Sequence, residues 1–180
     1  LIDTFWREHQ KDNFTQHPLK ILYIDIETYS PGAFPVPSEA KDTINVITVF
    51  DSLTDRFTTW GLHELTNSIQ NCKYIKCDNE VELLEKFLEY IESDYPDIIT
   101  GWNTEFFDIP YIINRVRNLL GEAAIDRLSP VGNIYKRKIT GLFGKEQDKY
   151  YIKGISCIDY LDIYKKFSMG LRESYKLDAI

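Results

Sequence analysis

Two carboxylates, Asp25 and Glu27, lie within a nonpolar segment, residues 21–30, whose composition is typical of a central β-strand. Side chains alternate across a strand, so the two acids share one face with Ile21 and Tyr23. Two ionised carboxylates so close together repel each other and lose hydration, and a proton or a cation must compensate for them. A hard divalent metal is the simplest such cation. For a D-x-E pattern alone, the alternative is a strand end whose acids reach water or pair with Lys or Arg.

A third acid, Asp108, lies where a loop meets a helical pattern, with Pro110 in the first turn of that helix. Asp is a favoured N-cap residue and Pro is tolerated in a first turn, so Asp108 alone indicates a helix cap that contributes about 1 kcal/mol. A metal ligand is the alternative. The combination of D-x-E with Asn103 and the dipeptide Phe107-Asp108, roughly eighty residues later, favours the metal ligand.

These acids need a scaffold that brings distant segments together, and the hydrophobic pattern predicts a mixed α/β arrangement. The second and third predicted strands flank a short turn and form a hairpin. The predicted strands cover residues 21–30, 44–50, 56–62, 73–77 and 96–100.

Two amphipathic helices alternate with these strands. The first covers residues 79–93, with Asn79 as N-cap and Glu82 three positions later, and its inward face consists of Val81, Leu84, Phe87, Leu88 and Ile91. The second covers residues 108–121, with Gly121 as C-cap, and its inward face consists of Ile109, Ile112, Ile113, Val116 and Leu120.

The composition is that of an ordinary soluble globular domain, with 180 residues of which 43% are hydrophobic and 14% aromatic. No nonpolar run approaches the roughly eighteen residues of a membrane span, and the first residues lack the pattern of a signal peptide. We therefore expect a cytoplasmic protein without a membrane partner. The cysteines, Cys72, Cys77 and Cys157, form neither an even disulfide set nor a zinc pattern, which predicts reduced packing thiols.

The net charge of −7 argues against a protein that coats nucleic acid in general, because such binding depends on clustered Lys and Arg. Residues 132–154 nevertheless hold six basic residues against two acidic ones, so this segment carries +4 and the remainder −11. A local basic patch on an acidic body is compatible with DNA binding at one place.

Five stretches, taken in order, resemble the 3′→5′ exonuclease domain of family-B DNA polymerases, and most closely that of T-even-type bacteriophages. YIDIET, residues 23–28, resembles the first exonuclease motif, and GWNTEFFDIPYIINRV, residues 101–116, resembles the second, N-x-x-x-F-D. The other three stretches are LSPVGNIYKRK, ISCIDYLDIYKKF and SYKLDAI. The resemblance covers residues 19–180, which implies that residues 1–18 are a linker from a preceding domain.

The resemblance implies a ribonuclease-H-like fold, in which a central mixed β-sheet is flanked by helices and carries a protruding β-hairpin. It also implies an active site of acids that bind two divalent metal ions, Mg or Mn, about 3.5–4 Å apart. Asp25 would be shared by both ions, Glu27 would bind the first, and Asp108 would contribute to the second, partly through water.

The activity implied by the resemblance is proofreading, in which the 3′-terminal phosphodiester of single-stranded DNA is hydrolysed at a primer end. The implied partners are this DNA, the remainder of the polymerase chain and, through the whole protein, the sliding clamp.

The resemblance also implies a further Asp in a third motif, Y-x-x-x-D, which would lie C-terminal to the SYKLDAI stretch and therefore beyond residue 180. Asp178 follows Tyr175 by three positions rather than four and is not a substitute. Asp159 and Asp162 lie in an amphipathic segment, where helix caps or salt bridges are their expected roles. We therefore expect a truncated exonuclease domain that binds metal weakly and has little or no activity by itself.

A hairpin is predicted within residues 133–156, where two β-rich arms surround residues 144–148. A solvated hairpin whose lysines protect its edges from aggregation is one interpretation. The resemblance implies instead the hairpin that helps to part a primer end from its template. Its expected DNA contacts are Lys136, Arg137, Lys138 and Lys145.

Further DNA contacts are expected at the second motif, from Asn103, Phe106 and Phe107. We expect one of the two phenylalanines to be buried and the other to support a terminal base.

Two other functions remain as alternatives. One is a DNA-binding or spacer module of the same fold whose acids no longer hold metal, and the joint presence of Asp25, Glu27 and Asp108 disfavours it. The other is a stand-alone exoribonuclease of related fold, which the phage-like stretches and the basic hairpin disfavour.

Overall fold

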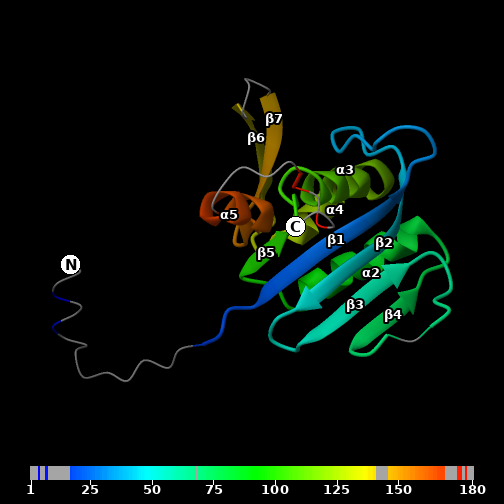
Figure 1. The fold of residues 1–180 in the computed structure, drawn as a ribbon, viewed down its shortest axis with the longest axis horizontal. Coiled ribbons are helices and arrows are strands. Elements are labelled where there is room, and N and C mark those ends of the chain that lie inside the picture. Colours follow the sequence, from blue (N-terminus) through cyan, green and yellow to red (C-terminus); the bar gives the residue numbers. More distant parts are fainter. Residues whose placement is uncertain are drawn as a thin grey trace.

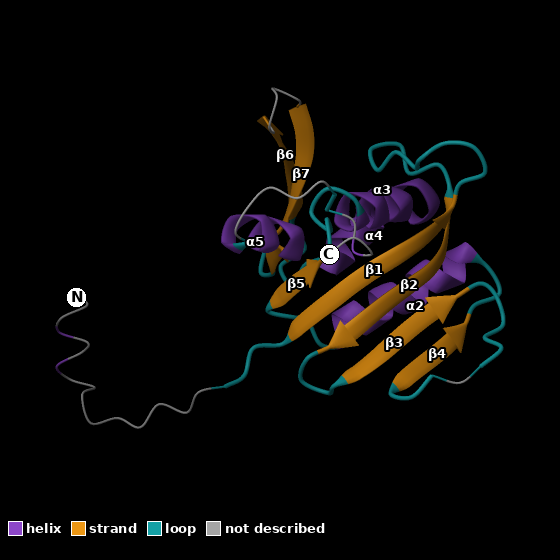
Figure 2. Ribbon diagram, viewed as in Figure 1, coloured by secondary structure: helices purple, strands orange, loops and turns teal. Residues whose placement is uncertain are grey.

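The chain folds around one six-stranded mixed β-sheet (Figures 1 and 2). The computed structural model describes residues 4, 7, 17–67, 69–140, 146–168, 174, 175 and 177. The strands are β1 (Ile21–Tyr29), β2 (Thr43–Asp51), β3 (Arg56–Gly61), β4 (Cys72–Lys76), β5 (Ile98–Gly101), β6 (Ile134–Thr140), β7 (Glu146–Ile152) and β8 (Ser156–Asp159). The helices are α2 (Glu80–Ser93), α3 (Asp108–Leu120), α4 (Glu122–Ile125), the 3₁₀ helix η1 (Asp126–Leu128) and α5 (Tyr160–Phe167).

The strand order, β4-β3-β2-β1-β5-β8, places β1 inside the sheet. β1, β2 and β3 form an antiparallel meander, whereas β5 pairs with β1, and β8 with β5, in parallel. The pairing of β5 with β1 covers only Ile21 to Tyr23. Within the described residues, the half of β1 that carries Asp25 and Glu27 therefore has a strand neighbour on one side alone, which is β2.

Helix α2 begins as predicted, because Asn79 Oδ1 accepts a hydrogen bond from the Glu82 N–H at 3.0 Å. Its buried face differs from the prediction at two positions, since Leu83 is buried whereas Val81 is 45% exposed. Val81 lies in the first turn at the edge of the apolar stripe, and Leu83 lies in line with Phe87 at the i+4 spacing. The predicted inward position of Val81 was therefore wrong.

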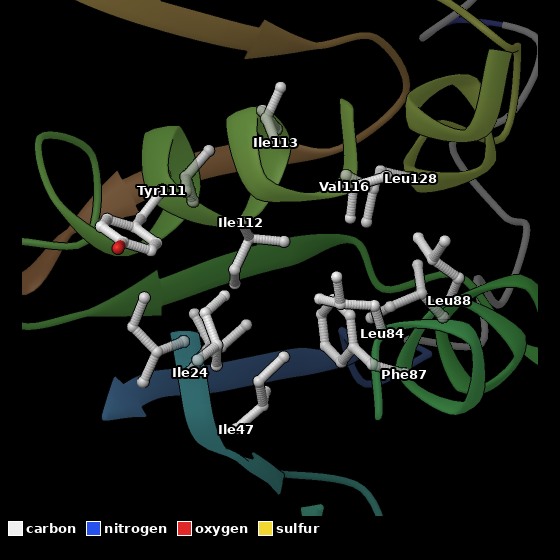
Figure 3. Packing of buried hydrophobic residues seen from close by; sticks show 14 of the residues in the cluster. Ile24, Ile47, Leu84, Phe87, Leu88, Tyr111, Ile112, Ile113, Val116 and Leu128 are labelled. Carbon is white, nitrogen blue, oxygen red and sulfur yellow. The ribbon is translucent and has the colours of Figure 1, made fainter. Parts of the chain in front are cut away.

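Helix α3 packs against the sheet through the predicted positions. Figure 3 shows Ile112 pointing from α3 toward Ile24 of β1. Leu120 is partly buried against the same core, and Gly121, with φ of 92°, ends the helix by donating its N–H to the Arg117 carbonyl. The predicted C-cap is confirmed. The remaining predicted core residues of this helix, Ile109, Ile113 and Val116, are buried.

Three elements were not predicted: β8, α4 and η1. Residues 158–164 were interpreted as one amphipathic segment, but the first two of them belong to the edge strand β8, which has four residues and a single fully buried one, Asp159. So short an edge strand carries too little alternation to be recognised.

The strands β6 and β7 form a separate antiparallel two-stranded sheet. Figure 1 shows this hairpin projecting from the body, as predicted. The three cysteines are free, in agreement with the prediction. Within the described residues, no helix combines the length and the nonpolar character needed to cross a bilayer.

Candidate active site

Strand β1 presents both of its acids on one face, as the alternation predicted. Tyr23, Asp25 and Glu27 are exposed, whereas the intervening side chains are buried in the core. The register of β1 with β2 shifts between Glu27 and Thr28, so β1 is irregular where it presents Glu27. Such irregularities bend a strand and redirect its side chains.

Asp108 reaches this strand from the other side. The residue is 3% exposed, and its Oδ1 accepts a hydrogen bond of 3.1 Å from the backbone N–H of Ile26, which lies between the two acids of β1. Because β5 stops pairing with β1 at Tyr23, this N–H needs a partner from outside the sheet. The carboxylate of Asp108 is that partner.

Asp108 does not cap its helix, which is the role that its position taken alone indicated. Asp108 is the first residue of α3, the N-cap position is Phe107, and no side chain caps this helix. The carboxylate is turned toward Ile26 instead, because a buried backbone N–H with no strand partner costs more free energy than a helix end that other groups can satisfy.

Two of the three acids influence each other electrostatically. Burial raises the pKa of Asp108 to about 7, and the charge of Asp25 is the second cause, while the Ile26 N–H opposes the shift. Partial burial also raises the pKa of Asp25. The less buried Asp25 ionises first, and its charge then disfavours ionisation of Asp108.

The donor set is suited to a hard cation but is incomplete. Carboxylate oxygens are the ligands that Mg²⁺ and Mn²⁺ prefer, and a cation near Asp25 and Asp108 would relieve the repulsion between them. In the described part of the chain, however, no three Asp, Glu, His or Cys side chains gather closely enough to hold a metal ion. The structure therefore brings Asp25 and Asp108 together without gathering Glu27 into a three-ligand cluster with them.

The loop that leads from β5 to Asp108, residues 102–107, is tightly built. A side chain at Gly101 would lie 2.5 Å from the backbone oxygen of Ile24 on β1, so only glycine fits there. Asn103 has a φ of 62°, in the left-handed region that Asn tolerates better than most residues. Its carbonyl accepts hydrogen bonds from the N–H groups of Phe106 and Phe107, which turns the chain into α3.

Comparison with known protein families decides what this arrangement belongs to. Residues 3–180 match the family described as DNA polymerase family B, exonuclease domain. The chain belongs to this family. Exonuclease domains of this family generally use divalent metal ions. The six-stranded mixed sheet with its flanking helices and hairpin agrees with their ribonuclease-H-like fold, so the predicted fold class is confirmed.

Individual relatives support the same family assignment. The chain is 36% identical over 205 residues to the DNA-directed DNA polymerase of Escherichia phage RB69, an alignment that covers 100% of this chain and 22% of the phage protein. It is 33% identical over 187 residues to the DNA-directed DNA polymerase of Enterobacteria phage T4, covering 90% of this chain and 21% of that protein. The DNA polymerase catalytic subunit of Saimiriine herpesvirus 2 is 26% identical over 96% of this chain and 18% of its own length. The chain thus spans about a fifth of the length of these curated relatives.

The two phenylalanines beside Asp108 do not divide as predicted, because both Phe106 and Phe107 are half-buried. The ring of Phe107 packs on that of Tyr111 at 5.8 Å and on that of Phe34 at 5.3 Å. Phe34 is 79% exposed. It lies in the proline-rich loop after β1, where nothing in the sequence pattern distinguishes it.

The hairpin of the exonuclease domain separates its basic residues onto two faces. On one face, Lys136 pairs with Asp148 at 2.8 Å and Lys138 pairs with Glu146 at 3.0 Å. This face borders a hollow of 430 Å³ between the hairpin, the start of α3 and the proline-rich loop. Its lysines are neutralised by their neighbours, which the sequence did not predict.

On the opposite face of the hairpin, the rings of Tyr135 and Tyr151 stack at 5.1 Å. Arg137 lies over both rings, at 5.3 and 5.8 Å, and Lys153 lies over Tyr135 at 5.8 Å. Neither cation pairs with a carboxylate of the described residues. We call Tyr135, Arg137, Tyr151 and Lys153 the aromatic face of the hairpin.

The middle of the hairpin is joined to the loop before Asp108 by an ion pair. Lys149 of β7 contacts Glu105 at 2.5 Å, and the side chain of Glu105 is 7% exposed. Burial raises the pKa of Glu105, although the neighbouring Lys149 counteracts it. Of the remaining predicted DNA contacts, Asn103 lies in the loop beside this pair, whereas Lys145 lies outside the described residues.

Proposed function

We propose that this exonuclease domain hydrolyses the 3′-terminal phosphodiester of single-stranded DNA, and that it proofreads within a family-B DNA polymerase. The observation that carries the proposal is the buried Asp108 carboxylate, held against β1 at Ile26 and repelled by Asp25. A cluster of acids is costly for a folded protein unless something uses it, and perturbed carboxyl groups concentrate at functional sites.

The acids have a defined part in this proposal. Asp25, Glu27 and Asp108 would hold two divalent ions, Mg or Mn, which would supply Lewis-acid stabilisation of the scissile phosphate and a more acidic water. The Ile26 N–H fixes the orientation of one Asp108 oxygen and leaves the other oxygen for a cation. A ligand from a third motif, Y-x-x-x-D, would complete the set. We propose that a chain without that ligand is weakly active or inactive.

The aromatic residues near Asp108 are suited to holding the end of a strand. Phe107 is fixed by Tyr111 and supports the exposed ring of Phe34, so the two rings form a platform that a terminal base can stack on. Stacking of a base on an aromatic side chain contributes about 1–3 kcal/mol and does not depend on which base it is. Such a platform suits an enzyme that must accept any mismatched end.

We propose that DNA follows the aromatic face of the hairpin rather than the face that carries Lys136 and Lys138. Arg137 and Lys153 are available for phosphates because neither pairs with a carboxylate of the described residues, whereas Asp148 and Glu146 neutralise the two lysines. We therefore propose that Lys136 and Lys138, which were predicted as DNA contacts, contribute less to DNA binding than Arg137 and Lys153 do.

Paired double variants test this assignment. Arg137→Ala with Lys153→Ala is expected to weaken binding of single-stranded DNA and to make the negative slope of log affinity against log salt shallower by about 1.4, because two phosphate contacts are lost. Lys136→Ala with Lys138→Ala is the matched control and should change both quantities little. The measurement is a fluorescence anisotropy titration at several salt concentrations. Equal effects of the two pairs would contradict the assignment.

The proposed function itself is tested in a protein that extends through the third motif. Labelled single-stranded DNA should be shortened stepwise from its 3′ end in Mg²⁺ and remain intact in EDTA. Binding without cleavage would favour the DNA-binding or spacer module. Faster cleavage of RNA than of DNA of the same sequence would favour the exoribonuclease.

The wider context is part of the same proposal. We propose that residues 1–18 link a preceding domain to the exonuclease domain of residues 19–180, that the remainder of a polymerase chain and, through it, a sliding clamp are partners, and that the protein acts in the cytoplasm of a host cell. The phage relatives support this context.

A further inference from the structure

Asp159 makes an unusual set of contacts for a helix cap. It is the last residue of β8 and the N-cap of α5, and it is 3% exposed. Its Oδ1 accepts hydrogen bonds from the N–H groups of Leu161, at 2.9 Å, and Asn103, at 3.0 Å. Its Oδ2 accepts a third hydrogen bond, of 3.1 Å, from the N–H of Glu105. Only the bond to Leu161 belongs to the cap, so two of the three serve another segment.

The other segment is the loop that carries the candidate active site. β8 pairs with β5 in a register that sets Asp159 opposite Gly101, immediately before the loop of residues 102–107. The carbonyls of Asn103 and Thr104 accept hydrogen bonds from the first N–H groups of the turn that becomes α3. The N–H groups of the loop thus donate hydrogen bonds to Asp159. Its carbonyl groups accept hydrogen bonds from the start of α3, the helix that carries Asp108.

This anchoring matters because the loop adopts a conformation that local preference does not favour. Asn103 sits in the left-handed region, with φ of 62°, and such a conformation persists only when the surroundings determine it. Hydrogen bonds from backbone N–H groups to a buried carboxylate are stronger than those to a neutral acceptor. No nearer carboxylate among the described residues bonds to the N–H of Asn103 or Glu105.

We propose that Asp159 is a positioning residue for the exonuclease site, acting through the backbone of Asn103 and Glu105 to fix the place of Asp108. This inference rests on the proposed function, since it concerns the same site. Asp159 does not touch the reacting atoms. Its effect is to hold the loop so that Asp108 meets β1 at Ile26, and a displacement of about 1 Å at such a site can lower a rate by roughly a hundredfold.

Two substitutions separate positioning from helix capping. In Asp159→Ser the hydroxyl can still cap α5, because Ser is a good N-cap residue, but it cannot reach both loop N–H groups. In Asp159→Asn one carbonyl oxygen remains for Leu161 and Asn103, while the bond to Glu105 is lost. Asp162→Asn is the matched control on the same helix, since Asp162 is exposed and makes no bond to the loop.

A second control accounts for stability. Asp51 is also a buried carboxylate that accepts backbone N–H bonds, from Leu53 at 2.8 Å and from Thr54, but in the turn after β2. Asp51→Ser should therefore lower stability without disturbing the loop.

The experiment compares these variants in the polymerase-length protein that carries this domain. For Asp159→Ser we expect kcat for single-stranded DNA to fall about a hundredfold with KM within a factor of two, and amide hydrogen exchange in residues 103–107 to accelerate at least tenfold. Asp159→Asn should show a smaller change of the same kind. Asp162→Asn and Asp51→Ser should leave kcat and the exchange of this loop unchanged.

Unchanged kcat and unchanged loop exchange in Asp159→Ser, or changes no larger than those of Asp51→Ser, would overturn the positioning role. If Asp159→Ser does not fold, Asp159→Asn decides by the same two readouts. A wild-type protein that cleaves no DNA would refute the proposed function instead, and the exchange measurement would still decide whether Asp159 holds the loop.

Discussion

Replacing Asp25 with alanine is expected to abolish DNA cleavage while leaving the fold intact. The proposed metal site loses the acid whose charge acts most strongly on Asp108, and a loss of about 4 kcal/mol of transition-state stabilisation corresponds to roughly a thousandfold in rate. Folding should be unchanged or slightly more favourable, because Asp25 is exposed on β1 and its charge repels Asp108. The measurement is release of 3′ nucleotides in Mg²⁺ by a protein that extends through the third motif.

The control for this substitution is Asp162→Ala, which removes an exposed acid away from the pair and should cleave DNA at the wild-type rate. Circular dichroism and thermal unfolding of both variants would verify that the fold survives. Equal nuclease rates for wild type and Asp25→Ala would show that the acids of β1 are structural, and the non-catalytic DNA-binding or spacer module would then be the better explanation.

Without metal, Asp108 is expected to make the domain less stable as the pH rises from about 4 to about 7. Its pKa is about 7 in the folded protein, against 3.8 for an ordinary Asp. Below pH 4 the carboxyl is protonated in both states and adds no penalty. Between these values the unfolded chain releases the proton and the folded protein retains it, so the free energy of unfolding falls by about 4 kcal/mol in total. Above pH 7 the penalty stays constant.

Asp108→Asn tests this directly, because Asn cannot ionise and its carbonyl can still accept the Ile26 N–H. In EDTA the variant should be more stable than wild type at pH 8 by up to about 4 kcal/mol, and the difference should vanish near pH 4. Urea unfolding at a series of pH values provides the measurement, with Asp51→Asn as a buried carboxylate away from the site. Stability curves of wild type and Asp108→Asn that run parallel from pH 4 to pH 8 would show that Asp108 does not titrate abnormally.

The predicted elements that the structure confirms depend on near neighbours in the chain. The alternation of β1 places Asp25 and Glu27 on one face, and the helical spacing of α3 buries Ile112 and Val116. A strand repeats every two residues and a helix every three or four, so these patterns are present in any short window of sequence. The same reasoning failed for Val81, which lies at the edge of the apolar face of α2. It also failed for β8, which is too short to show a repeating pattern of buried and exposed residues.

The sequence alone does not show which basic residues of the hairpin are paired with acids. The basic residues Lys136, Arg137 and Lys138 are consecutive in sequence and look equivalent as a patch. Only the pairing of β6 with β7 decides that the two lysines meet acids, while Arg137 turns to the other face and lies over the tyrosine rings. A difference of one position in a strand reverses the face, so the register determines which cation is available.

The sequence alone determined the candidate acids of this domain, Asp25, Glu27 and Asp108, to which we assign the proposed chemistry, and the strand and the helix that carry them. The tertiary structure alone decided how they meet. Because β5 stops short of the acids, the Ile26 N–H takes Asp108 as its partner across 82 residues, and the same strand end places Asp159 beside the loop of Asn103 and Glu105. Contacts over such separations depend on where neighbouring strands begin and end in space, and no periodicity within the chain records that.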